Sequence, residues 1–167
     1  MNYDNEGHII LPEKKKDFLL VDGYNIIHAW KDLSELAKTN LDSAREALLN
    51  ILADYQGFKG MTLITVFDAY RVKGGKETIR RFHNIYVVYT KEAETADAYI
   101  EKTVHEIARK NNVTVATSDG LEQVIVFGEG AVRMSARELW EEVCKTKEEV
   151  REITDRASPK LENKLKF

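Results

Sequence analysis

The chain has 167 residues, of which 43% are hydrophobic and 32% are charged, and its 25 basic and 28 acidic residues give a net charge of −3. This composition excludes a disordered chain, and the near balance of charge excludes a protein that coats nucleic acid with a uniformly basic surface. The single cysteine excludes an internal disulfide, and no apolar run approaches the roughly 20 residues that span a bilayer.

The two ends of the chain lack the pattern of a buried core. The prolines, Pro12 and Pro159, both lie near an end, and the first residues do not follow the order of a secretory signal. We therefore predict a flexible N-terminal extension over residues 1–16, one domain over 17–155 and a C-terminal tail over 156–167. The protein is expected to be cytoplasmic, without a membrane partner.

The first half of the domain predicts a strand, a helical region and a second strand. A buried strand is expected over 18–21, followed by a helix or irregular turn over 26–37. A long helix is expected to begin at Ser43, because Glu46 three residues later would complete a capping box. A β-branched run over 62–67 then predicts a strand that is buried on both faces.

The second half continues the alternation of strands and helices. It predicts a glycine-containing loop, a strand over 85–89, a helix from Thr95 to about 110, a strand over 113–117, a short helix over 121–127, a strand over 132–134 and a last helix capped by Ser135. This order indicates an α/β fold with a mainly parallel sheet and helices on both faces. In such sheets the functional crevice lies beyond the carboxyl ends of the strands.

Acidic residues follow the predicted strands at that edge. Asp22 and Asp68 directly follow the first and second strands, and Asp119 comes two residues after the fourth. Asp97 lies at the start of the helix that follows the third strand. Carboxylates that converge resist ionisation unless a cation sits among them, and an all-oxygen set suits Mg²⁺ or Mn²⁺. The pattern therefore predicts a divalent metal site.

Each of these residues also has a purely structural interpretation. Asp119 would cap the next helix, Asp97 would favour its helix dipole, and Asp68 would belong to a turn. Asn25 would either position a water or the metal shell through its amide, or bond its own backbone in a turn. The joint pattern favours a site, since independent caps on one edge are the less economical account.

Basic residues are concentrated in the loop after the second strand. A flexible basic loop beside an acidic metal site suits a polyanion, although any single member could be an ordinary solvated charge. The candidate RNA-binding residues in this loop are Arg71, Lys73, Lys76, Arg80 and Arg81, and Lys91 and Arg133 are expected to extend the same surface. The candidates for stacking on bases, with core packing as the alternative, are Tyr24, Trp30, Tyr70 and Phe82.

The ordered motifs resemble those of a known family. The segments "LLVDGYNII", "VFDAY", "TKEAETADAYIEK", "VATSDGLEQ" and "GEGAVRMSARELWEEV" resemble the NYN domain nucleases of the PIN-like group, specifically the YacP-type branch. The resemblance covers about residues 17–150 and implies a PIN-like three-layer α/β/α sandwich. It implies that Asp22 and Asn25 begin the active site. Asp68, Asp97 and Asp119 would complete it, and Asp22, Asp97 and Asp119 would hold the metal.

The resemblance also implies an activity and partners. YacP-type members are similar to ribosome-associated endoribonucleases that cut messenger RNA, which implies a metal-dependent endoribonuclease with RNA and the ribosome as partners and no organic cofactor. The alternative is a non-catalytic RNA- or ribosome-binding module. A receiver domain is disfavoured because no acidic pair follows the first strand. A haloacid dehalogenase phosphatase is disfavoured because Asp22 is followed by Gly-Tyr-Asn rather than by a second aspartate.

Overall fold

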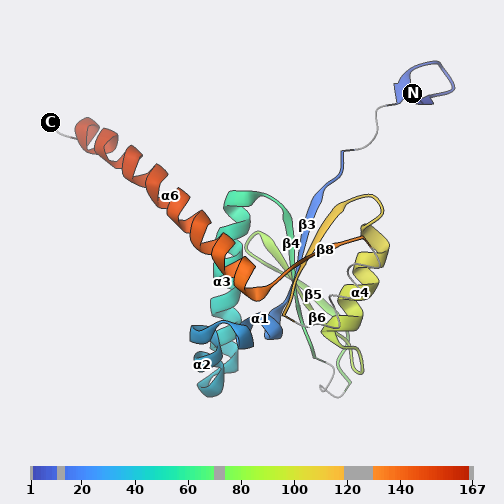
Figure 1. The fold of residues 1–167 in the computed structure, drawn as a ribbon, viewed down its shortest axis with the longest axis horizontal. Helices are drawn as coiled ribbons and strands as arrows, with labels where there is room; N and C mark the ends of the chain where they lie inside the picture. Colours follow the sequence, from blue (N-terminus) through green and yellow to red (C-terminus); the bar gives the residue numbers. More distant parts are fainter. Residues whose placement is uncertain (1, 11–13, 70–73, 119–129, 166–167) are drawn as a thin grey trace.

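The structure is a computed structural model that describes residues 2–10, 14–69, 74–118 and 130–165. Near the N-terminus, β1 (Asn2–Tyr3) and β2 (Ile9–Ile10) pair antiparallel as a separate two-stranded sheet. This small sheet lies away from the main one (Figure 1). The described part of the chain contains no helix long and apolar enough to cross a membrane.

The main sheet has six strands in the order β5-β6-β4-β3-β7-β8. All neighbours are parallel except β5 and β6, which form an antiparallel pair, so the prediction of a mainly parallel sheet is confirmed. The strands are β3 (Asp17–Asp22), β4 (Thr62–Phe67), β5 (Thr78–Phe82), β6 (Ile85–Tyr89), β7 (Asn112–Ala116) and β8 (Val132–Met134).

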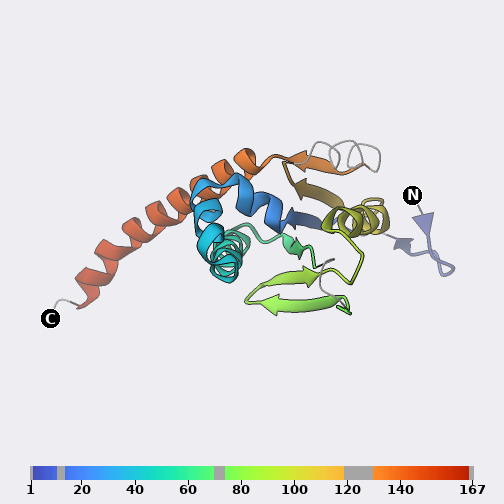
Figure 2. The same cartoon turned by 90° about the horizontal axis from the view of Figure 1, so that it is seen from below.

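Helices cover both faces of this sheet. The helices are α1 (Gly23–Ala29), α2 (Lys31–Thr39), α3 (Leu41–Lys59), α4 (Ala96–Ile107) and α6 (Ala136–Leu165). Figure 2 shows α4 on one side of the sheet and α1, α3 and α6 on the other. The three-layer α/β/α sandwich is therefore confirmed, and α6 continues well beyond the edge of the sheet (Figure 1).

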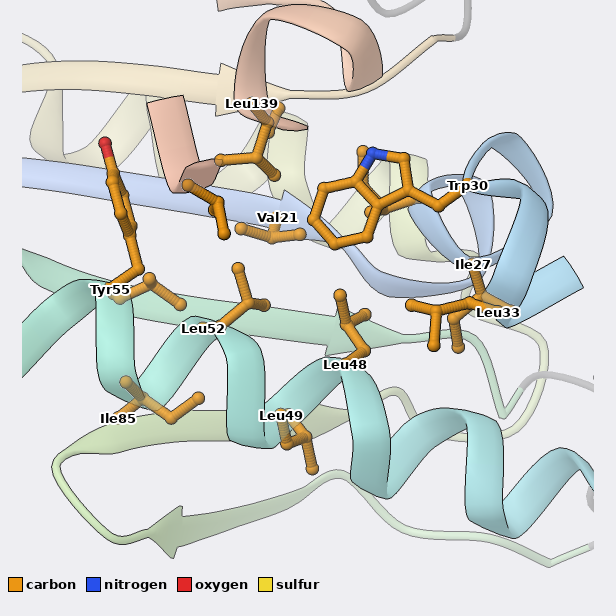
Figure 3. Packing of buried hydrophobic residues seen from close by; sticks show 14 of the residues in the cluster. Val21, Ile27, Trp30, Leu33, Leu48, Leu49, Leu52, Tyr55, Ile85 and Leu139 are labelled. Atoms are coloured by element: carbon orange, nitrogen blue, oxygen red, sulfur yellow. The ribbon is translucent and has the colours of Figure 1, made fainter. Parts of the chain in front are cut away.

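Alternation along the central strand builds the two halves of the core. Leu19 and Val21 point to the face covered by α1, α3 and α6, whereas Leu20 points to the face covered by α4. Figure 3 shows the first half, in which Val21 meets Leu52 of α3 and Leu139 of α6. Because β3 is buried on both faces, the residues at its end have fixed positions.

The structure differs from the prediction at the start of α3. The helix begins two residues before Ser43, because the side chain of Asn40 accepts a hydrogen bond from the Ser43 backbone N–H at 3.0 Å. Asn40 is thus the N-cap, and the capping box predicted from Ser43 and Glu46 is wrong. The region expected as one helix or irregular turn is two helices, α1 and α2, with Trp30 between them.

The loop expected between the second and third predicted strands contains a strand, β5. It pairs along its whole length with β6 and forms an edge of the main sheet. Arg80 and Arg81 therefore lie on a hydrogen-bonded strand, and the expectation that they belong to a flexible loop is wrong.

Two predicted helix caps are confirmed. Thr95 accepts a hydrogen bond from the Ala98 N–H at 3.1 Å. Ser135 forms a complete capping box, in which its hydroxyl accepts from the Glu138 N–H at 3.1 Å and its own N–H donates to the Glu138 carboxylate at 3.2 Å. Hydrogen bonding of the Glu138 carboxylate with the side chain of Ser135, and then with its backbone N–H, lowers the pKa of Glu138. The short helix expected over 121–127 lies outside the described residues.

Candidate active site

The carboxyl ends of four adjacent strands lie at one edge of the sheet. The strands β6, β4, β3 and β7 are neighbours and run parallel, so the residues that end or directly follow them are brought together. We call this the carboxyl edge, and its marker residues are Asp22, Asp68, Thr90 and Ser118. It is the edge at which the sequence predicts a site.

Asp22 is the last residue of β3 and is only 7% exposed. It occupies the N-cap position of α1, yet its side chain forms no capping hydrogen bond with that helix. A purely structural role as a helix cap therefore does not explain Asp22. Carboxylates are rarely buried without a structural or functional reason, so a buried aspartate at the end of a central strand is a candidate functional group.

Gly23 allows α1 to start directly against β4. A Cβ atom at this position would overlap the ring of Phe67, which is fully buried. The Phe67 ring also contacts Tyr24, with ring centroids 5.0 Å apart, and stacks on Tyr89 at 5.5 Å. The glycine after Asp22 is thus required by close packing rather than by a tight turn, and an aromatic layer supports the carboxyl edge.

Asn25 of α1 is bonded to the segment that follows β7. Its side-chain oxygen accepts a hydrogen bond of 2.5 Å from the backbone N–H of Ser118, which follows β7. Because that oxygen is committed to another segment, Asn25 is not a turn residue that bonds its own backbone. It fixes the position at which the chain leaves β7 towards Asp119, which lies outside the described residues.

Thr90 joins β4 to the start of α4. Its buried hydroxyl accepts from the Ala69 N–H at 3.0 Å and donates to the Glu94 carbonyl at 2.7 Å. Its backbone N–H also donates to the Phe67 carbonyl at 3.1 Å. The sequence analysis missed this residue, because a threonine after a strand carries no pattern of its own.

Asp68 directly follows β4 at the carboxyl edge, and Asp97 lies at the start of the helix that follows β6. Both are half-buried; Asp97 lies in the first turn of α4, a helix that packs against β3 and β4. Nearby, a Glu94 carboxylate oxygen lies 3.4 Å from the Lys102 ammonium. Burial opposes the charge on Lys102, but the hydrogen bond and negative charge of Glu94, with the charge of Glu77, raise the pKa of Lys102 overall.

The described acids do not form a metal site by themselves. Among the residues that the structure describes, no group of three or more histidine, cysteine, aspartate or glutamate side chains could hold a metal ion. One of the three predicted ligands, Asp119, falls outside those residues. The described acids Asp22, Asp68 and Asp97 offer only carboxylate oxygens as possible ligands, and oxygen ligands suit a hard divalent cation.

Comparison with known proteins identifies the family. The model of the YacP-like NYN domain matches residues 19–166. The chain belongs to the YacP-like NYN domain family. It is 47% identical over 131 residues to the uncharacterized protein YacP of Bacillus subtilis strain 168, covering 76% of this chain and 75% of that protein. NYN domains are PIN-like and nuclease-like, they act on RNA, and they generally use divalent metal ions.

Solved structures agree with this assignment. The crystal structure of Rae1 (YacP) from Bacillus subtilis superposes with a TM-score of 0.72 at 42% identity, covering 89% of this chain and 86% of that one. A mutant of Rae1 in which one tryptophan is replaced by leucine gives a TM-score of 0.74 at 39% identity, covering 85% and 83%. The fold of this NYN domain is therefore that of a solved homologue.

The predicted RNA-binding residues of the NYN domain divide between two edges of the sheet. Lys76, Arg80 and Arg81 are exposed on or just before β5, where the Arg81 guanidinium lies 5.1 Å from the centre of the Tyr86 ring. Arg133 lies on β8, at the opposite edge, so it does not extend the same surface. Arg71 and Lys73 lie outside the described residues.

The described end of the basic loop is held against the segment that follows β6. The Gly74 N–H donates to the Glu92 carboxylate at 2.9 Å, and the Glu92 N–H donates to the Gly75 carbonyl at 2.8 Å. Exposed Lys91 lies in the same segment, directly before Glu92. These bonds connect the β5 side of the NYN domain to the carboxyl edge.

The aromatic residues singled out for base stacking are mostly committed elsewhere. Trp30 is 6% exposed and its indole N–H donates to the Ala136 carbonyl at 2.8 Å. Tyr24 is half-buried, and its hydroxyl accepts from Arg45 at 3.0 Å. Phe82 packs against the core as a half-buried residue, and Tyr70 lies outside the described residues.

Proposed function

We propose that this NYN domain is a metal-dependent endoribonuclease that hydrolyses phosphodiester bonds of RNA, with messenger RNA on the ribosome as its substrate. The observation that carries the proposal is Asp22, a buried carboxylate at the end of the central strand that does not cap its helix. Family membership adds the chemistry, since NYN and PIN-like nucleases generally use divalent metal ions. The cytoplasmic location expected from the sequence stays a prediction.

The acidic residues would hold the ion. Asp22, Asp97 and Asp119 are the proposed ligands, with Asp68 in support. A bound Mg²⁺ or Mn²⁺ ion would supply a more acidic water and neutralise charge that develops on a phosphate. Asp22 would hold the ion from a largely buried position, and Asn25 would act as a positioning residue by fixing Ser118, which directly precedes Asp119.

The exposed cations on the β5 side would hold the RNA backbone. Lys76, Arg80 and Arg81 face solvent, and the bonds of Glu92 to Gly74 and Gly75 connect their strand to the carboxyl edge. Phosphate contacts of this kind orient a nucleic acid without reading its sequence. Lys91 is placed closer to the carboxyl edge, directly after β6, and would contact phosphates near the cleaved bond.

Cleavage assays test the proposal directly. Wild-type protein, Asp22→Asn and Asp97→Asn would be incubated with RNA in EDTA and with added Mg²⁺ or Mn²⁺. We expect metal-dependent internal cleavage by the wild type and losses of at least about 100-fold in both variants, since even outer-shell partners of metal ligands contribute about 10- to 100-fold. The control is Asp54→Asn, which neutralises an exposed aspartate of α3 away from the carboxyl edge and should retain full activity.

Two results would contradict the proposal. Cleavage that persists in EDTA, or full activity in Asp97→Asn, would exclude a metal-dependent reaction at this edge. RNA affinity without cleavage under any metal condition would favour the alternative, a non-catalytic RNA- or ribosome-binding module.

The ribosomal part of the proposal needs a separate assay. The same message would be presented as naked RNA and on translating ribosomes, with Asp97→Asn as the inactive control. We expect faster cleavage on translating ribosomes. Equal rates on both substrates would remove the ribosome from the proposal and leave the endoribonuclease activity intact.

A further inference from the structure

A cleft lined by two tryptophans opens beside the carboxyl edge. It has a volume of about 490 Å³ and lies between the α1–α2 junction and the first turns of α6. We call it the tryptophan cleft, and its lining includes Trp30, Trp140, Leu33, Ile51, Ala136 and Ser118. Neither the sequence analysis nor the proposed catalytic residues account for Trp140.

The two indoles form a preformed aromatic wall. Their ring centroids are 5.0 Å apart at an interplanar angle of 66°, an edge-to-face contact. Trp30 is fixed by its hydrogen bond to the Ala136 carbonyl and by the surrounding core (Figure 3). Trp140 packs against this fixed ring, yet 40% of it remains exposed. A large apolar ring held half-exposed suits a flat, aromatic ligand.

The tryptophan cleft is connected to the carboxyl edge by short covalent and hydrogen-bonded paths. Ser118 lines the cleft and is bonded to Asn25 of α1. The same helix begins directly after Asp22 and ends at Ala29, directly before Trp30, and its seven residues rise by roughly 10 Å. A strand of RNA with a phosphate beside Asp22 therefore needs only a short reach to place a neighbouring base in the cleft.

Charged residues at the rim of the tryptophan cleft can contact the phosphate backbone of RNA. Lys31 and Arg137 contribute positive charges and Asp32 a negative one. Arg137 is paired with Glu141 at 3.2 Å, but both side chains are largely exposed, so the pair is weak and open to exchange with a phosphate. The lining is apolar in its depth and charged at its rim, which matches a nucleotide with its base inserted.

We propose that the tryptophan cleft binds an unpaired nucleobase of the RNA substrate adjacent to the cleaved phosphodiester, with Trp140 as the stacking residue. This inference rests on the proposed function, because it assigns a base-binding subsite to that reaction. Stacking on an aromatic side chain tolerates any base, so the subsite selects for single-stranded RNA rather than for a sequence.

Binding measurements test the subsite without requiring cleavage. Full-length Asp97→Asn protein would be titrated with fluorescently labelled single-stranded RNA, alone and combined with Trp140→Ala or Trp140→Phe. We expect Trp140→Ala to weaken binding about tenfold, within the range for one stacked base, and Trp140→Phe to recover part of the loss. Phe58→Ala is the matched control, since Phe58 is also 40% exposed but lies at the far end of α3, and it should bind as well as the parent.

An abasic scan identifies the ligand. A series of oligonucleotides would each carry one abasic nucleotide, at successive positions. We expect loss of the base at a single position, next to the cleavage site, to weaken binding to the Asp97→Asn parent. The same loss should not change binding to the protein that also carries Trp140→Ala. Thermal unfolding would show whether each variant is folded. Trp140→Phe keeps an aromatic ring against Trp30.

The failures of the two proposals are distinguishable. Equal RNA affinity for Trp140→Ala, Phe58→Ala and the parent would overturn the subsite, while metal-dependent cleavage by the wild type would leave the nuclease standing. An effect of Trp140→Ala that appears only with ribosomes, and not with abasic position, would overturn the subsite in favour of a protein contact. Trp140-dependent binding at one abasic position without cleavage by the wild type would support base binding in the tryptophan cleft but would remove the nuclease, and with it the placement of that base beside a cleaved bond.

Discussion

The carboxyl edge and the β5 edge differ in how they hold their functional residues. At the carboxyl edge, Asp22 is buried and its surroundings are joined by side-chain hydrogen bonds of Asn25 and Thr90 that cross between elements. At the β5 edge, Arg80 and Arg81 are exposed and are positioned mainly by the strand that carries them. The residues proposed to catalyse cleavage are thus held by bonds from several elements. The residues proposed to bind the RNA backbone only need to lie on one exposed surface. Substitutions at the first edge should affect folding, and those at the second should affect binding alone.

The largest effect is expected at Gly23. The substitution Gly23→Ala places a methyl group into the Phe67 ring, and overpacking of this kind should lower the free energy of unfolding by about 2–3 kcal/mol. Chemical denaturation would measure the change, and cleavage should fall as well because α1 carries Asn25.

A matched glycine shows whether packing is the cause. Gly57 lies inside α3, and a Cβ there would have its nearest neighbour at 3.6 Å, so Gly57→Ala should be neutral or stabilise by about 0.5–1 kcal/mol. Equal destabilisation by both substitutions would contradict the close-packing account of Gly23.

The next effect is expected at Thr90. The substitution Thr90→Val keeps the shape but leaves the Ala69 N–H and the Glu94 carbonyl without the hydroxyl, which should cost about 2 kcal/mol in denaturation experiments. The control is Thr65→Val, because the Thr65 hydroxyl is buried and has no hydrogen-bond partner within the described residues. That substitution should be neutral or stabilising, and a larger loss at Thr65 than at Thr90 would refute the bridging role of Thr90.

At the β5 edge we expect a change in binding without a change in folding. The double substitution Arg80→Gln/Arg81→Gln should weaken RNA binding and reduce the slope of log affinity against log salt by about 0.7 for each lost phosphate contact. The free energy of unfolding should change by less than about 0.5 kcal/mol. Arg109→Gln, an exposed residue after α4, serves as the control. An unchanged salt slope in the double variant would remove β5 from the binding surface.

The smallest effect concerns Lys102 of α4, which approaches both Glu94 and Glu77. Because folding raises the pKa of Lys102, its stabilisation is complete below the ordinary value of 10.5 and is lost as the pH rises through the higher folded value. The side chain is 48% exposed, so the contribution should stay below about 0.5 kcal/mol. Unfolding of the wild type and Lys102→Met between pH 9 and pH 11.5 should converge at high pH, whereas a constant difference would assign the effect to packing.

Local patterns predicted much of the fold. The strands over 62–67, 85–89 and 132–134 have the predicted bounds, because short apolar or β-branched runs are bounded by polar residues. The serine and threonine helix caps could be predicted only where no second capping residue lay nearby. At α3, Asn40 and Ser43 are both good caps three residues apart, and the first one is used.

Other features have no local signal. The strand β5 contains two adjacent exposed arginines, so it shows no alternation, and it forms only by pairing with β6. The bond between Asn25 and Ser118 joins residues 93 positions apart, and nothing in one sequence reports it. The acids of the carboxyl edge could be predicted because they follow strands; Trp140, within a helix rich in charges, could not.

The strand order has a consequence for synthesis. The first strand of the main sheet is central, and one of its neighbours, β7, is made 95 residues later, as the contact of Asp17 with Asn112 shows. At about 5–20 residues per second, a nascent chain waits roughly 5–20 s for that partner. Until then the backbone groups on one side of β3 are unpaired and can pair with a wrong strand. The main sheet can therefore be completed only after the last third of the polypeptide has emerged.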